Sequence, residues 1–72
     1  MIDEVFHVSV SGDGDEEGGI YSPQAFDRRF SHAYAFMQER DADFMQYGSD
    51  AEKSVIIKRC DADDFKASQV IL

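Results

Sequence analysis

The sequence predicts an α+β fold in which one main helix packs on a small antiparallel sheet. Three segments support this prediction: residues 4–11 alternate apolar and polar side chains, residues 23–40 repeat apolar side chains every three or four positions, and residues 54–60 are rich in aliphatic β-branched residues. Alternation is typical of a strand with one buried face, and the longer spacing is typical of a helix with one apolar stripe. Packing the helix on the sheet buries both apolar faces, and a chain of 72 residues is expected to form a single domain, 1–72.

The first expected element is a strand over residues 4–11. Its two faces carry Phe6, Val8 and Val10 on the apolar side and His7, Ser9 and Ser11 on the polar side. The glycine-rich and acidic segment 12–19 then interrupts regular structure, because glycine weakens backbone order and neighbouring carboxylates repel one another. Ile20 and Tyr21 are expected to return as a short strand beside the first one.

The main helix is expected over residues 23–40. Ser22 is a good N-cap, and Pro23 is tolerated at the first helical position because its missing N–H needs no partner there. The apolar stripe consists of Phe26, Phe30, Ala33, Tyr34 and Met37. The opposite face consists of Gln24, Arg28, Ser31, His32, Ala35 and Glu39. Phe36 lies at the edge of the stripe and is a candidate exposed contact residue.

The remaining chain reads as mainly extended. We expect a strand over 44–47, a turn over 48–52, and a strand over 54–60 that is apolar on both faces and therefore central in the sheet. Residues 61–68 are expected to form a short helical turn capped by Asp61, and residues 69–72 a final strand. The similar stretches 41–44 and 61–65 are interpreted as two equivalent capping turns.

The acidic loop resembles the calcium-binding loop of EF-hands over about twelve residues. Read from Asp13, carboxylates stand at positions 1, 3 and 5, and a glycine stands at position 6. Position 12 is Gln24, which cannot supply the bidentate carboxylate, and the segment before the loop reads as a strand instead of a helix. We therefore expect no calcium site, and no other metal or cofactor.

No catalytic constellation stands out in the sequence. His7 and His32 lie on expected polar faces, and Cys60 lies within an aliphatic strand without an orienting third group. Such a cysteine is typically a small buried side chain, so we expect a protein that is not an enzyme.

The expected location is the cytoplasm. A single cysteine excludes an internal disulfide, and small secreted domains usually depend on such links. The first residues lack the basic start and long apolar run of a signal peptide. The aliphatic runs 55–57 and 70–72 are far too short to cross a membrane, so no membrane association is expected.

The net charge of the chain indicates which kind of partner it can bind. Fifteen acids against seven bases give −8, which repels nucleic-acid phosphates and anionic membranes and favours a protein partner with a basic surface. The acids cluster at 13–17, 39–52 and 61–64, where rows of carboxylates can imitate a phosphate track. The candidate partner-binding residues are Asp13, Asp15, Glu16, Glu17, Asp61, Asp63, Asp64 and Phe36.

In size and charge the chain is similar in type to small phage-encoded inhibitors, such as anti-CRISPR and anti-restriction proteins. The resemblance implies a non-catalytic protein that docks on a nucleic-acid-handling partner and inhibits it, without binding nucleic acid directly. The alternative is a structural or assembly module that acts as a homodimer through apolar strand edges, with its charge serving solubility.

Overall fold

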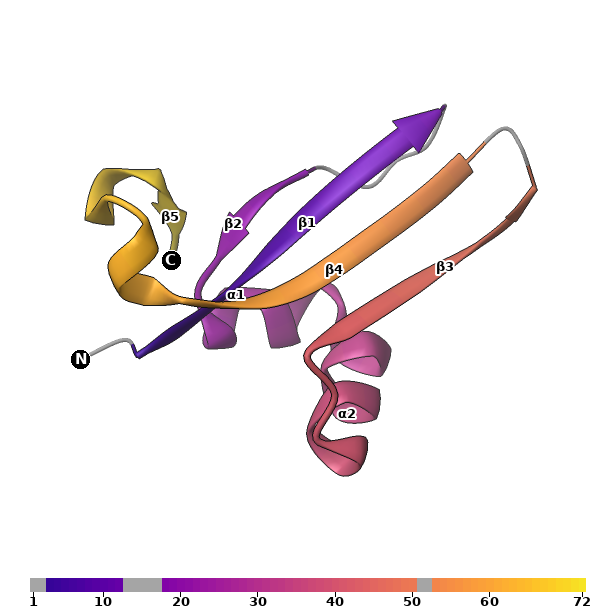
Figure 1. Cartoon of the computed structure of the whole chain (residues 1–72), viewed down its shortest axis with the longest axis horizontal. Coiled ribbons are helices and arrows are strands. Elements are labelled where there is room, and N and C mark those ends of the chain that lie inside the picture. The colour runs from indigo at the N-terminus through magenta and orange to yellow at the C-terminus, as the bar shows by residue number, and fades with distance from the viewer. Residues whose placement is uncertain (1–2, 13–17, 51–52) are drawn as a thin grey trace.

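A computed structural model describes residues 3–12, 18–50 and 53–72 (Figure 1). Five strands form one sheet in the order β3-β4-β1-β2-β5, and two helices pack on one of its faces, so the predicted α+β class is confirmed. In chain order the elements are β1 (Glu4–Gly12), β2 (Gly19–Tyr21), α1 (Pro23–Arg29), α2 (Ser31–Arg40), β3 (Phe44–Asp50), β4 (Lys53–Asp61), the 3-10 turns η1 (Ala62–Asp64) and η2 (Ala67–Gln69), and β5 (Val70–Ile71).

The two longest strands, β1 and β4, are antiparallel neighbours at the centre of the sheet. Their register runs from Glu4 opposite Asp61 at one end to Gly12 opposite Lys53 at the other. This confirms the strands expected over 4–11 and 54–60 and the central place of the second. Successive side chains of a strand point to opposite faces of the sheet, and one face meets the helices while the other, called the open face below, does not. Val5, on the open face, is nevertheless as completely buried as Phe6 on the helix-covered face.

The helix-covered face holds the core. Phe6 stacks on Phe26 with ring centroids 4.3 Å apart and planes 5° apart, and Tyr34 meets both rings edge-on. The predicted stripe is confirmed, because its residues are buried or half-buried against the sheet. The buried members of the cluster are Phe6, Val8, Tyr21, Ala25, Phe26, Phe30, Ala33, Met37, Val55 and Ile57. Each large side chain among them adds about 1.5–3 kcal/mol of transfer free energy.

The prediction of a single helix over 23–40 is wrong in one respect, because the chain forms two helices that are separated at Phe30. This residue has φ −127° and ψ 55°, and Figure 1 shows α1 and α2 running in different directions. The break costs little hydrogen bonding, since the Phe30 N–H donates to Phe26 O (2.7 Å) and the Phe30 carbonyl accepts from Tyr34 N–H (2.9 Å). It leaves the Phe30 ring packed edge-on against Tyr21 at 5.6 Å. Ser22 caps α1 as expected, accepting from the Ala25 N–H at 3.2 Å.

The expectation of a purely antiparallel sheet is also wrong for the last strand. β5 pairs parallel to β2, with Ile20 opposite Val70 and Tyr21 opposite Ile71, so the sheet is mixed. The reason is the path after β4: the two 3-10 turns carry the chain past β1 and β2, and it returns in the direction of β2. The Ser22 N–H donates to Ile71 O (2.9 Å) and fixes this strand.

Two local expectations need correction. The turn expected over 48–52 begins later, because β3 continues to Asp50 through a bulge, with Gly48 at φ 108°; residues 51–52 lie outside the described chain. The stretches 41–44 and 61–65 are not equivalent. Asp41 ends α2 in the left-handed conformation (φ 51°, ψ 45°), whereas Asp61 begins η1 and accepts from the Asp63 N–H at 3.4 Å. An aspartate suits both places, because its short side chain tolerates the left-handed region and also caps turns.

Candidate functional site

Carboxylates from three segments of the chain, 3–4, 41–43 and 61–64, lie toward one end of β1 and β4. The register places Glu4 opposite Asp61, and the Ala62 N–H donates to Asp3 O (3.1 Å), which holds η1 beside the start of β1. Asp41 and Asp43 join them between α2 and β3. We call this surface the acidic end; it consists of Asp3, Glu4, Asp41, Asp43, Asp61, Asp63 and Asp64.

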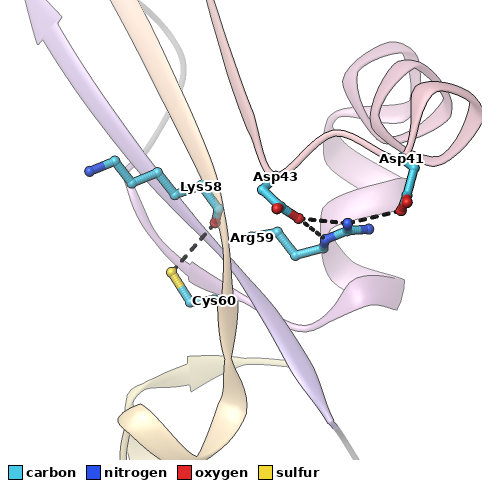
Figure 2. Close-up of polar contacts among 5 residues, drawn as sticks. All are labelled: Asp41, Asp43, Lys58, Arg59 and Cys60. Carbon is cyan, nitrogen blue, oxygen red and sulfur yellow. Dashed lines mark hydrogen bonds and ion pairs between the residues drawn. The ribbon is translucent and has the colours of Figure 1, made fainter.

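Arg59 organises the acidic end. Figure 2 shows its guanidinium reaching from β4 between two carboxylates, 2.7 Å from Asp43 and 3.2 Å from Asp41. The hydrogen bonds that Arg59 donates to Asp43 and, to a lesser extent, to Asp41 raise the pKa of Arg59 above its usual range. The Arg59 side chain is 18% exposed, whereas the Asp41 and Asp43 side chains are 93% and 81% exposed. The two carboxylates are therefore the more exposed partners of these ion pairs.

Asp61, Asp63 and Asp64 are brought together as expected. All three are exposed, and they lie in or directly before η1. Asp61 has a structural role as well, since its carboxylate caps η1 through the Asp63 N–H. Asp63 and Asp64 are therefore the predicted acids whose side chains are most available to a partner.

The other predicted acids, Asp13, Asp15, Glu16 and Glu17, lie outside the described residues. The described chain before them ends at Gly12, which is opposite Lys53, at the far end of β1 from Glu4 and Asp61. The register of β1 and β4 therefore places Gly12 at the opposite end of the two strands from the acidic end.

Sequence reasoning left four members of the acidic end out of the candidate residues: Asp3, Glu4, Asp41 and Asp43. A signal for two of them is present in the sequence, because acids precede the first strand and follow the strand at 54–60. Antiparallel pairing of these two strands brings those ends together. The contact of Arg59 with Asp41 and Asp43 has no comparable signal, since it depends on where α2 ends.

Phe36 is 39% exposed on α2. The guanidinium carbon of Arg40, one turn later, lies 4.9 Å from the centre of its ring, a cation–π geometry. Its exposure is compatible with the contact role expected from the sequence, and binding through it stays a prediction.

The residues considered for chemistry are not gathered in one place, although Cys60 lies on β4 between Arg59 and Asp61. His32 is exposed on α2, His7 is half-buried on the open face with its ring centre 6.3 Å from that of Phe65, and the Cys60 thiol lies 3.7 Å from the Lys58 carbonyl oxygen (Figure 2). Within residues 3–12, 18–50 and 53–72, no group of three or more histidine, cysteine or acidic side chains is placed to hold a metal ion. None of the helices in that part of the chain is long and apolar enough to cross a membrane.

A shallow hollow of about 470 Å³ lies between the α1–α2 junction and β3. Its lining is mainly apolar, with Arg29 and His32 among the residues around it and Phe30, Ala33, Met45 and Tyr47 at its walls. It lies beside an edge of the sheet, away from η1.

No protein-family model matches the chain, and comparison with curated proteins and with solved structures finds no significant match.

Proposed function

We propose that the protein is a non-catalytic cytoplasmic inhibitor that docks its acidic end on a basic surface of a nucleic-acid-handling protein. The observation that carries this proposal is the arrangement around Arg59. Arg59, two residues before Asp61 on the chain, forms ion pairs with Asp41 and Asp43, and the carboxylates are the more exposed partners of these pairs. Carboxylates held in this way can occupy a groove that otherwise accepts phosphates.

Preorganisation distinguishes this surface from solvated charge. Asp41 follows the last turn of α2, where the Ala42 N–H donates to Met37 O (2.9 Å), and Asp61 is fixed by its cap on η1. A rigid row of charges loses less conformational freedom on binding than mobile side chains do. The overall charge of −8 adds long-range attraction to a basic partner and opposes direct contact with nucleic acid.

The test is an inhibition assay on a panel of purified CRISPR effector nucleases and restriction endonucleases. DNA cleavage is measured at increasing protein concentration, with and without preincubation. The wild-type protein is expected to inhibit at least one enzyme. The double variant Asp63→Asn/Asp64→Asn is expected to need about tenfold more protein, equivalent to about 1.4 kcal/mol.

The matched control is Asp27→Asn/Glu39→Gln. It removes the same two charges from exposed positions on the helices, outside the acidic end. Equal inhibition by both double variants would show that net charge, and not the acidic end, supplies the binding. Absence of inhibition across the panel would remove this class of partner.

A further inference from the structure

The two edges of the sheet differ in how much unpaired backbone they present. β3 forms one edge with seven residues, and β5 forms the other with two (Figure 1). The Arg59 N–H donates to Asp43 O (2.9 Å), and the register continues with Phe44 opposite Lys58. Hydrogen-bonded and non-hydrogen-bonded pairs alternate along antiparallel strands, so Phe44 and Gln46 direct their N–H and C=O groups toward the free edge.

The described edge lacks the usual protection against pairing. Residues 44–47 contain no charged side chain and no proline. The acids that precede them in the sequence, Asp41 and Asp43, form ion pairs with Arg59. Natural edges are commonly protected by lysine, proline, bulges or very short strands. Here the bulge begins only after Tyr47, and the short strand is at the opposite edge. The backbone groups of Phe44 and Gln46 therefore face the edge without these protections.

Apolar side chains accompany the free backbone on both faces of the sheet. Phe44 is 50% exposed on the open face. Met45 and Tyr47 are half-buried on the helix-covered face, where they line the hollow of about 470 Å³ together with Phe30. A strand added at this edge would cover Phe44 and close the side of the hollow.

We propose that a second copy of the chain occupies this edge, with the two β3 strands antiparallel about a two-fold axis near Met45. In that register Phe44 of one copy is opposite Gln46 of the other, so the outward N–H and C=O groups of both copies are paired. The two Met45 side chains meet between the two hollows. Residues 44–47 of this edge are uncharged in a protein of net charge −8, and the same uncharged residues of a second copy can pair with them without repulsion between like charges.

This dimer has a salt dependence opposite to that of the acidic end. Two copies of charge −8 repel each other at long range, so added salt favours their association. Docking on a basic partner is instead weakened by salt. The dimer does not depend on the proposed inhibitory function, and each proposal can fail alone.

The experiment is sedimentation equilibrium of the full chain at about 50 mM and about 500 mM salt. We expect a monomer–dimer equilibrium that tightens at the higher salt. Phe44→Lys puts a charge opposite Gln46 of the other copy and two like charges diagonally across the two-fold axis, and it is expected to raise the dissociation constant at least about tenfold. The control Ala35→Lys makes the same charge change on the exposed face of α2 and should leave it unchanged.

A second variant separates edge pairing from general apolar contact. Gln46→Pro removes an N–H that points away from β4, so it should weaken the dimer while leaving the backbone hydrogen bonds between β3 and β4 in place. It also removes the hydrogen bond from the Gln46 side chain to the Ser54 hydroxyl on β4, so Gln46→Ala, which keeps the N–H, is the control. Circular dichroism verifies that each variant is folded. The proposal is overturned by a monomer at every concentration and salt, even if a foreign strand then binds the edge. It is equally overturned by a dimer that tolerates Phe44→Lys or disappears only when residues 69–72 are removed.

Discussion

The helix-covered face of the sheet and the acidic end adjoin each other at the ends of β1 and β4 but have opposite chemistry. On the first, Phe6, Val55 and Ile57 are completely buried. On the second, the side chains of Asp41 and Asp43 are 93% and 81% exposed. The two regions meet at Arg59, which is opposite Phe6 in the register yet pairs with the acids. Substitutions in the first region should therefore change stability, and substitutions in the second should change binding.

The largest effect is expected from Phe26→Ala. Phe26 is completely buried and stacks on Phe6 and on Phe30, whose ring centre is 5.4 Å away. Its truncation should cost about 3–5 kcal/mol, because the cavity left in a packed core adds to the lost transfer free energy. That is comparable to the whole free energy of unfolding of a small domain, about 5 kcal/mol. Urea denaturation followed by circular dichroism measures the loss.

Phe36→Ala is the matched control, since the same residue type is 39% exposed there. It should cost about 1 kcal/mol or less, because it removes little buried area and one cation–π contact. Equal denaturation midpoints for the two variants would contradict the assignment of the core.

A smaller effect is expected from Ser22→Ala. The Ser22 hydroxyl accepts the Ala25 N–H at 3.2 Å, and the residue is buried at the start of α1. Loss of this cap should reduce the free energy of unfolding by about 1 kcal/mol. Ser22→Asp keeps an acceptor and serves as the comparison. If alanine and aspartate variants unfold at the wild-type midpoint, the cap contributes nothing to stability.

The next effect is the change in unfolding free energy caused by Arg59→Met, which measures how much the acidic end contributes to the stability of the fold. Its ion pairs lie near the surface, so after allowance for solvent screening they are worth about 1 kcal/mol or less. Without the cation, Asp41, Asp43 and Glu4 repel one another, and the variant should regain stability as salt is added. Arg28→Met removes an exposed arginine elsewhere and should show no such recovery. A variant that is equally destabilised at all salt concentrations would point to lost packing of the side chain instead.

The pH dependence of this effect follows from the raised pKa of Arg59. A group whose pKa is higher in the folded state stabilises the protein below its unfolded pKa, and the contribution is lost as pH rises through the folded value. Both values lie above the neutral range. The difference in unfolding free energy between wild type and Arg59→Met should therefore stay constant between about pH 6 and about pH 9. A difference that falls within this interval would assign the contribution to another group.

The local spacing of apolar residues is sufficient to predict the strands and helices that form the core. The alternation around Phe6 and the stripe from Phe26 to Met37 are short-range patterns, and the structure follows both. The break at Phe30 has no glycine or proline to mark it, because it results from packing of that ring against Tyr21. The parallel direction of β5 depends on the path of two 3-10 turns, which no pattern within residues 69–72 records.

The acidic end was predictable only in part for the same reason. Asp61, Asp63 and Asp64 are close together in the sequence and were recognised as a cluster. Asp41 and Asp43 join them through Arg59, whose partners are 16 and 18 residues away along the chain. A composition argument counts such charges but does not place them, because strand register and the end of α2 decide their positions.

The most direct test of the separation between fold and function is the salt dependence of partner affinity. For any enzyme that the protein inhibits, the dissociation constant is measured over a salt series for wild type and for Asp63→Asn/Asp64→Asn, and the unfolding free energy of both is measured alongside. We predict a shallower salt dependence and weaker low-salt binding for the variant, with unfolding free energies that agree within about 0.5 kcal/mol. The same salt slope and affinity for both proteins would contradict the acidic end as the binding surface.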